Sequence, residues 1–170
     1  MPNILFLTLG ANRDKNHIIK DLIFEAHRNE MGSVVLCQNP RVAFGMQRDV
    51  NLWLRDKSPN WNLGMLIALQ LQRGWEGKIN LVTVSSERKD QERLYDYLEK
   101  LSDYARLPAM TEFHVIIDSF DEALKSAPKA DINIFGLPFE VPFEFMRESP
   151  ELTHSSCIFV KDSGYESALV

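Results

Sequence analysis

Two adjacent serines followed by charged residues form the first arrangement in this sequence that could do chemistry. Ser85-Ser86-Glu87-Arg88 directly follows an apolar, strand-like run. Backbone N–H groups at the start of a helix there could hold an anion such as phosphate. The same residues suit a simpler role, in which the Ser86 hydroxyl oxygen caps the helix. Capping is the ordinary role for a serine at this place, and anion binding is the alternative.

Two glycine-containing stretches do not match known phosphate-binding loops. Gly10-Ala11-Asn12-Arg13-Asp14 follows the first strand-like run, but it lacks both the GxGxxG pattern and a terminal Gly-Lys-Ser/Thr. Gly74-Trp75-Glu76-Gly77-Lys78 contains Gly-Lys but precedes a strand, whereas a P-loop follows a strand and begins a helix. These motifs therefore predict no nucleotide cofactor.

Histidine, cysteine and serine positions favour neither a metal site nor a nucleophile. No two of the histidines lie three or four residues apart, the spacing that brings ligands together on a helix; they are His17, His27, His114 and His154. His114 lies in an apolar strand and reads as a structural residue. No Gly-x-Ser-x-Gly elbow occurs, and neither cysteine has a CxxC partner. We predict a protein that is not an enzyme, with no catalytic residue, metal or cofactor.

Composition limits the class of protein further. The chain has 170 residues, 45% hydrophobic and 25% charged, with a net charge of -5. This balance is typical of one soluble globular domain, expected over residues 1–170. An acidic domain lacks the positive surface that nucleic acids require, so we expect no nucleic-acid partner. No run approaches the roughly 20 apolar residues of a membrane span. Cys37 and Cys157 lie in apolar runs and read as buried thiols of a reducing compartment.

Strand-like and helix-like segments alternate along the chain and would position these residues. Strands are predicted at residues 4–9, 33–37, 50–54, 79–84, 113–117, 131–135 and 157–161. Helices are predicted at residues 18–28, 62–73, 86–106 and 119–124, the last opened by a Ser119 cap. The mixed charges of residues 87–103 indicate a solvated helix face. This alternation predicts an α/β fold, a mostly parallel sheet with helices on both faces.

A set of short motifs resembles the cytosolic tail of cation-chloride cotransporters, most closely the Na-K-Cl type of microbes. The motifs occur in order from Pro2 to the end of the chain and resemble the distal half of such a tail. They are the strand opened by Pro2-Asn3, the tryptophan strand Asn51-Leu52-Trp53-Leu54, the apolar helix at 62–71, the strand at 129–138 that ends in Leu-Pro, and the closing strand at 157–161.

The resemblance implies a universal-stress-protein-like fold and a role on the cytoplasmic side of the cell membrane. It implies a non-catalytic domain that regulates a membrane transporter and forms a homodimer, with the transmembrane transport domain of the same protein as its other partner. No membrane insertion of this segment itself is expected. The Pro-rich stretch at 138–150 is too apolar for a linker and must pack against something. Its apolar side chains are the interface candidates: Phe139, Phe143, Phe145 and Met146. A role in the core is the alternative for the same side chains.

The likeness to universal stress proteins leaves an alternative, a stand-alone protein that binds a nucleotide or a small anion. ATP-binding members place a Gly-rich loop after their fourth strand. The comparable segment here, residues 136–142, has one glycine, two prolines and Glu140. Proline lacks an N–H donor, and Glu140 would repel phosphate. We therefore expect no tight ATP binding.

Overall fold

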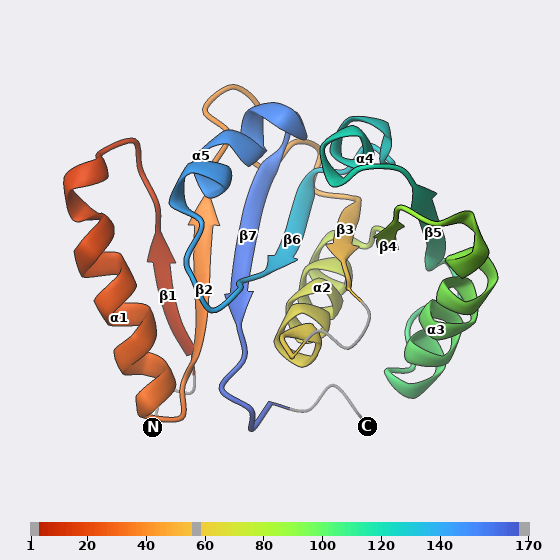
Figure 1. The fold of residues 1–170 in the computed structure, drawn as a ribbon, viewed down its shortest axis with the longest axis horizontal. Helices are drawn as coiled ribbons and strands as arrows, with labels where there is room; N and C mark the ends of the chain where they lie inside the picture. Colours follow the sequence, from red (N-terminus) through yellow and green to blue (C-terminus); the bar gives the residue numbers. More distant parts are fainter. Residues whose placement is uncertain (1–3, 56–58, 167–170) are drawn as a thin grey trace.

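The computed structural model describes residues 4–55 and 59–166 and forms a seven-stranded sheet with five α-helices (Figure 1). The Pro2-Asn3 motif lies outside the described residues. The strands are β1 (Ile4–Thr8), β2 (Gly32–Cys37), β3 (Val50–Trp53), β4 (Ile79–Ser85), β5 (Glu112–Ile117), β6 (Ile132–Gly136) and β7 (Ser156–Lys161). The helices are α1 (Asn16–Arg28), α2 (Trp61–Trp75), α3 (Gln91–Tyr104), α4 (Phe120–Ser126) and α5 (Phe143–Leu152), with short 3-10 turns η1 (Arg13–Lys15) and η2 (Arg88–Asp90).

The sheet is mostly parallel, as predicted. Its strand order is β1-β2-β7-β6-β3-β4-β5. Five of the six strand pairs are parallel, and the pair of β2 with β7 is antiparallel. The five strands from β7 to β5 therefore point the same way. From β3 the chain builds outward to β4 and β5, and then returns to add β6 and β7 on the other side of β3.

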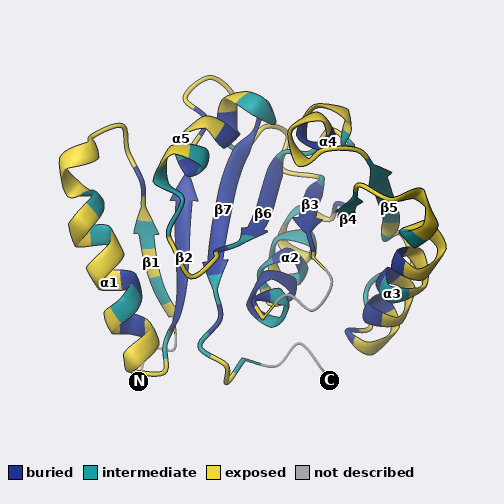
Figure 2. Ribbon diagram, viewed as in Figure 1, coloured by how far each residue is buried: buried dark blue, intermediate teal, exposed yellow. Residues whose placement is uncertain are grey.

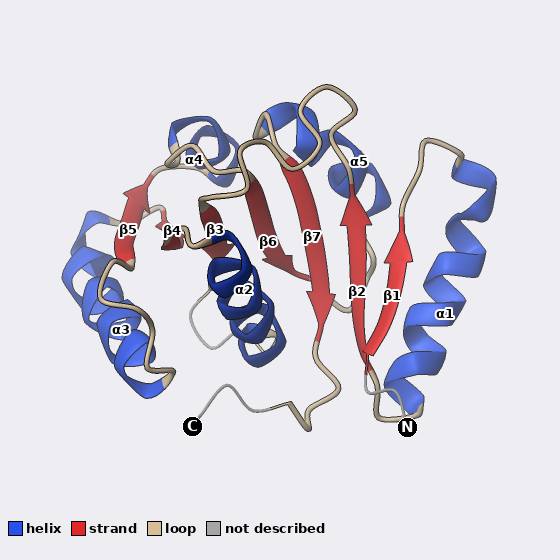
Figure 3. Ribbon diagram, turned by 180° about the vertical axis from the view of Figure 1, so that it is seen from behind, coloured by secondary structure: helices blue, strands red, loops and turns tan. Residues whose placement is uncertain are grey.

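Helices cover both faces of this sheet, which confirms the predicted layers. Helices α1, α4 and α5 pack on one face, around a core that includes Ile23, Leu124 and Met146. Helices α2 and α3 pack on the opposite face (Figure 3). Leu63 and Leu98 are fully buried there. The central strands are buried, whereas the edge strand β1 alternates between exposed and intermediate residues (Figure 2).

Helix α5 was not predicted, because prolines at 138, 142 and 150 resemble helix breakers. Pro142 stands at the N-cap, where a missing N–H costs nothing. Pro150 lies in the last turn and cannot donate to the carbonyl of Met146, four residues earlier. The Ser149 hydroxyl donates to that carbonyl instead, at 3.1 Å. The expectation that this stretch packs against the fold was correct, since Met146 is fully buried.

The predicted Ser86 cap is wrong. Helix α3 begins at Gln91, after the 3-10 turn η2, and no side chain caps it. The neighbouring Ser85 hydroxyl accepts a hydrogen bond from the Glu87 N–H instead, at 3.1 Å. The Ser119 cap of α4 is confirmed, with its hydroxyl accepting from the Glu122 N–H at 3.3 Å.

Candidate functional site: a pocket where the strand order reverses

A pocket of about 480 Å³ lies beyond the carboxyl ends of β3, β4 and β6. The strand order reverses between β3 and β6, because the chain builds outward from β3 first on one side and then on the other. Ligands of open α/β sheets bind at such a point. We call this cavity the switch-point pocket, and it lies on the face covered by α4 and α5.

Three aromatic rings from neighbouring strands form the floor of the switch-point pocket. Trp53, Phe135 and Phe159 occupy matching register positions on β3, β6 and β7. The rings of Trp53 and Phe135 stack at 5.4 Å and 22°, and those of Phe135 and Phe159 at 5.3 Å and 19°. All three residues line the pocket, and because the rings stack on one another, their edges form an apolar base.

Two further phenylalanines stand over this floor. Phe120, the first residue of α4, meets Trp53 edge-to-face at 5.7 Å. Phe145 of α5 meets Phe159 edge-to-face at 5.8 Å and Phe120 at 5.6 Å. Edge-to-face contact is favourable for aromatic rings. Phe120 is still 42% exposed, which leaves apolar ring surface at the pocket uncovered.

Buried asparagines hold the tryptophan of the floor in place. Trp53 Nε1 donates to Asn133 Oδ1 at 2.7 Å. Asn133 Oδ1 also accepts from Asn51 Nδ2 at 3.1 Å, and Asn51 Oδ1 accepts from Asn80 Nδ2 at 2.8 Å. These three asparagines lie side by side on β4, β3 and β6, two register positions before the aromatic rings and on the same face of the sheet. This polar row fixes the indole against the sheet.

Among the described residues, the rim of the pocket carries one positive and one negative side chain, Arg55 and Asp118, together with hydroxyl groups. The Ser85 and Ser119 hydroxyls already accept backbone hydrogen bonds within their own turns. Asp118 Oδ1 accepts from the Ser119 N–H at 2.7 Å. The Ser85 hydroxyl also donates to Asp90 Oδ2 at 3.1 Å. With an apolar base and this rim, the pocket suits the binding of a small molecule.

The Pro-rich loop between β6 and α5 forms one wall, through Pro138 and Pro142. It offers few backbone donors to a phosphate, because neither proline has an N–H. The expectation of no tight ATP binding stays a prediction.

The interface candidates lie at very different depths. Phe139 is 78% exposed, and its ring meets Phe24 of α1 at 5.8 Å and 64°. Phe143 is half-buried, with the Arg147 guanidinium 5.8 Å from its ring. Phe145 belongs to the pocket, and Met146 is 0% exposed in the core.

Sequence reasoning missed the aromatic row of the pocket. Trp53, Phe135 and Phe159 each stand at or near the end of a predicted strand, and this was a usable signal. The three rings meet only because β6 lies between β3 and β7, and that order is not written in any one segment.

Other candidate residues do not form sites. Three histidines are exposed, and His114 lies half-buried on the edge strand β5, with Nε2 3.4 Å from Glu112 Oε2. Among the described residues, no three His, Cys, Asp or Glu side chains gather closely enough for a metal ion.

Both cysteines are free and buried, and burial raises the pKa of Cys37 to about 12 and of Cys157 to about 11. Thiols with such a pKa stay protonated and are poor nucleophiles.

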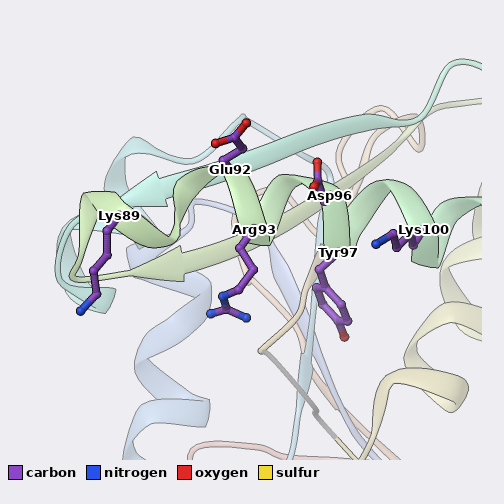
Figure 4. Close-up of a pocket in the computed structure, with 6 residues that line it drawn as sticks. All are labelled: Lys89, Glu92, Arg93, Asp96, Tyr97 and Lys100. Carbon is purple, nitrogen blue, oxygen red and sulfur yellow. The ribbon is translucent and has the colours of Figure 1, made fainter.

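Helix α3 presents the solvated, charged face that the sequence indicates. A surface depression along it is lined by charges of both signs with one tyrosine, shown in Figure 4: Lys89, Glu92, Arg93, Asp96, Tyr97 and Lys100. Neighbouring charges pair at the start of the helix, where Lys89 Nζ lies 2.5 Å from Glu87 Oε2.

Within residues 4–55 and 59–166, no helix is long and apolar enough to cross a bilayer.

Several solved structures resemble this fold, and three of them show how far the likeness extends. The crystal structure of the cytoplasmic domain of a prokaryotic cation chloride cotransporter is 31% identical, with a TM-score of 0.90 over 98% of this chain and 66% of that one. A universal stress protein from Archaeoglobus fulgidus DSM 4304 is 12% identical, with a TM-score of 0.55 over 92% of this chain and 60% of that one. A functionally unknown protein from Pseudomonas aeruginosa PAO1 is 7% identical, with a TM-score of 0.52 over 95% of this chain and 63% of that one. The last two show likeness of fold alone.

No curated protein matches the chain, but the model of a protein family does. The model of the family described as "Prokaryotic cation-chloride cotransporter, C-terminal domain, 2nd" matches residues 45–169, which contain β3 to β7 and α2 to α5. The chain spans about 66% of the solved cytoplasmic domain. With a family match over most of its length and a whole-chain likeness to that domain, the chain belongs to the family of prokaryotic cation-chloride cotransporter C-terminal domains.

Proposed function

We propose that this chain is a regulatory and dimerisation domain, without catalytic activity, on the cytoplasmic side of a Na-K-Cl type cotransporter. It corresponds to the distal half of the cytosolic tail, and its partners are a second copy and the transmembrane transport domain of the same protein. Family membership supports the assignment to a cotransporter. A pair of such domains would fix how two transport domains sit, so that a change at their contact biases the transport cycle.

The observation that carries the dimerisation proposal is Phe139. Its side chain is 78% exposed, more than any other large apolar side chain among the described residues. It is held between Pro138 and Val141-Pro142, and its ring rests against Phe24. An aromatic ring presented on a stiff loop loses little entropy when a partner covers it, which is typical of interface anchors. Covering a phenylalanine fully contributes about 1.5–3 kcal/mol.

Sedimentation equilibrium of the chain and of Phe139→Ser tests this proposal. Each 1.4 kcal/mol of lost burial is tenfold in the dissociation constant, so we expect a weakening of about tenfold to a hundredfold. Met110→Ser is the matched control, because Met110 is 56% exposed and precedes β5 at the far end of the sheet. Far-UV circular dichroism of both variants should match that of the wild type, which would show that the fold is intact.

A second variant separates Phe139 from the edge strand β1. Among the described residues β1 pairs only with β2, and it exposes Phe6 by 58%. Phe6→Lys would block edge-to-edge pairing of β1. Loss of the dimer in this variant alone would assign the interface to β1 and refute the role of Phe139. A wild-type chain that stays monomeric at hundreds of micromolar would refute dimerisation.

A further inference from the structure

The switch-point pocket is open and apolar, and the proposed dimer contact does not use it. Its volume of about 480 Å³ lies within the range of small-molecule sites. The geometry points to a binding site for a small, flat, mainly apolar molecule that carries at most one negative charge. This inference goes beyond the proposed function and does not depend on dimerisation.

The arrangement of the aromatic rings in the pocket indicates that the ligand is flat. The rings of Trp53, Phe135 and Phe159 lie within about 22° of their neighbours across three strands. Because these rings stack on one another, their edges face the pocket, so a planar ligand can lay its face across these edges or present its own edge to Phe120 and Phe145, which border the same space. The uncovered surface of Phe120 would be buried by such a ligand, and burial of apolar surface is favourable.

The rim limits the charge of the ligand. Among the described residues that line the pocket, Arg55 is the only positively charged one and Asp118 the only negatively charged one. Arg55 is exposed and forms no ion pair with a described residue, so it is free to meet one acidic group. Asp118 already accepts from the Ser119 N–H and opposes further negative charge.

The same features disfavour a nucleotide. A polyphosphate needs several backbone N–H groups or cations, but Pro138 and Pro142 supply no N–H. The Ser85 and Ser119 hydroxyls are engaged in their own turns. A single arginine does not balance the several negative charges of ATP.

Fluorescence titration of the folded chain with 1-anilinonaphthalene-8-sulfonate tests the inference, because this probe is flat, apolar and singly charged. We expect saturable binding of one probe per chain. Ser86→Trp places an indole at the exposed rim and should weaken binding at least tenfold. Phe120→Ala removes a wall and should weaken it as well. Gln70→Trp adds the same indole to an exposed position on α2, on the opposite face of the sheet, and should leave binding unchanged.

Three results would overturn the inference. The first is probe binding that does not saturate at one per chain. The second is equal affinity in wild type and Ser86→Trp, with circular dichroism showing that both are folded. The third is displacement of the probe by millimolar ATP, which would assign the pocket to nucleotides. All these binding measurements are made on the chain alone, so they test the ligand site whether or not the chain forms a dimer.

Discussion

Replacing Asn133 with alanine should destabilise the domain by removing the support of Trp53. Asn133 Oδ1 accepts from Trp53 Nε1 at 2.7 Å and from Asn51 Nδ2 at 3.1 Å, and its Nδ2 donates to Ser155 Oγ at 2.7 Å. Asn133 is 2% exposed and Trp53 is 7% exposed, so water does not easily replace these bonds.

The size of the loss in unfolding free energy depends on which hydrogen bonds the partners of Asn133 keep after the substitution. Asn51 Nδ2 still donates to the Pro128 carbonyl at 2.7 Å, and Ser155 Oγ stays 3.2 Å from Thr153 Oγ1. Trp53 Nε1 loses the only hydrogen-bond partner that it has among the described residues. An orphaned buried donor costs about 1–3 kcal/mol, and the small cavity adds about 1 kcal/mol. We therefore expect Asn133→Ala to lower the free energy of unfolding by about 2–4 kcal/mol.

A double-mutant cycle with Trp53→Phe isolates the hydrogen bond. Urea unfolding is followed by far-UV circular dichroism, because Trp53→Phe changes the fluorescence signal. Phenylalanine has no N–H to leave unpaired, so Asn133→Ala should cost about 1–3 kcal/mol less in that background. A coupling energy below about 0.3 kcal/mol would refute the reasoning, since it is the size expected of independent sites.

Three further outcomes follow from buried or crowded positions. Met146→Ala should cost about 2–5 kcal/mol in urea unfolding, because its side chain is 0% exposed in the core; a smaller loss would contradict the burial. Burial, helped by Glu166, raises the pKa of Asp162 to about 7. The folded chain then binds more protons than the unfolded one between about pH 4 and pH 7, so stability should fall by roughly 2–4 kcal/mol as pH rises through that window. Asp162→Asn should abolish this fall, and a pH profile identical to wild type would exclude the assignment. Gly77→Ala should lower the melting temperature sharply, because a Cβ there would lie 1.6 Å from the Arg48 carbonyl oxygen.

The elements that sequence reasoning found are those with a strong local pattern. Predicted strands at 50–54 and 113–117 correspond to Val50–Trp53 and Glu112–Ile117, because runs of β-branched and aromatic residues bounded by polar turns have few other stable conformations. Helix α5 escaped prediction because its prolines are tolerated only through local details, the N-cap position of Pro142 and the hydroxyl of Ser149. Such compensation depends on geometry that residue types alone do not show.

The pocket was not predicted because its residues come from segments that are far apart in the sequence. Trp53, Phe135 and Phe159 come from three strands, and only the strand order β7-β6-β3 makes them neighbours. The antiparallel pairing of β2 with β7 is likewise a tertiary choice. Reasoning from strand ends did identify the right edge of the sheet, because carboxyl ends of parallel strands always share an edge. It placed attention on Ser85 and Ser86, which line the pocket's rim, and missed the rings beneath them.

The pocket and the proposed interface share one structural element. Pro138 and Pro142 wall the switch-point pocket, and Phe139 lies between them on the same loop. A ligand that favours one arrangement of this loop changes the free energy of any partner contact that Phe139 makes. Linkage then requires the converse, that dimerisation change the affinity for the ligand by the same factor. If both proposals hold, a small molecule bound at the carboxyl edge of the sheet would regulate the pairing of the tails, with no rearrangement of the sheet itself.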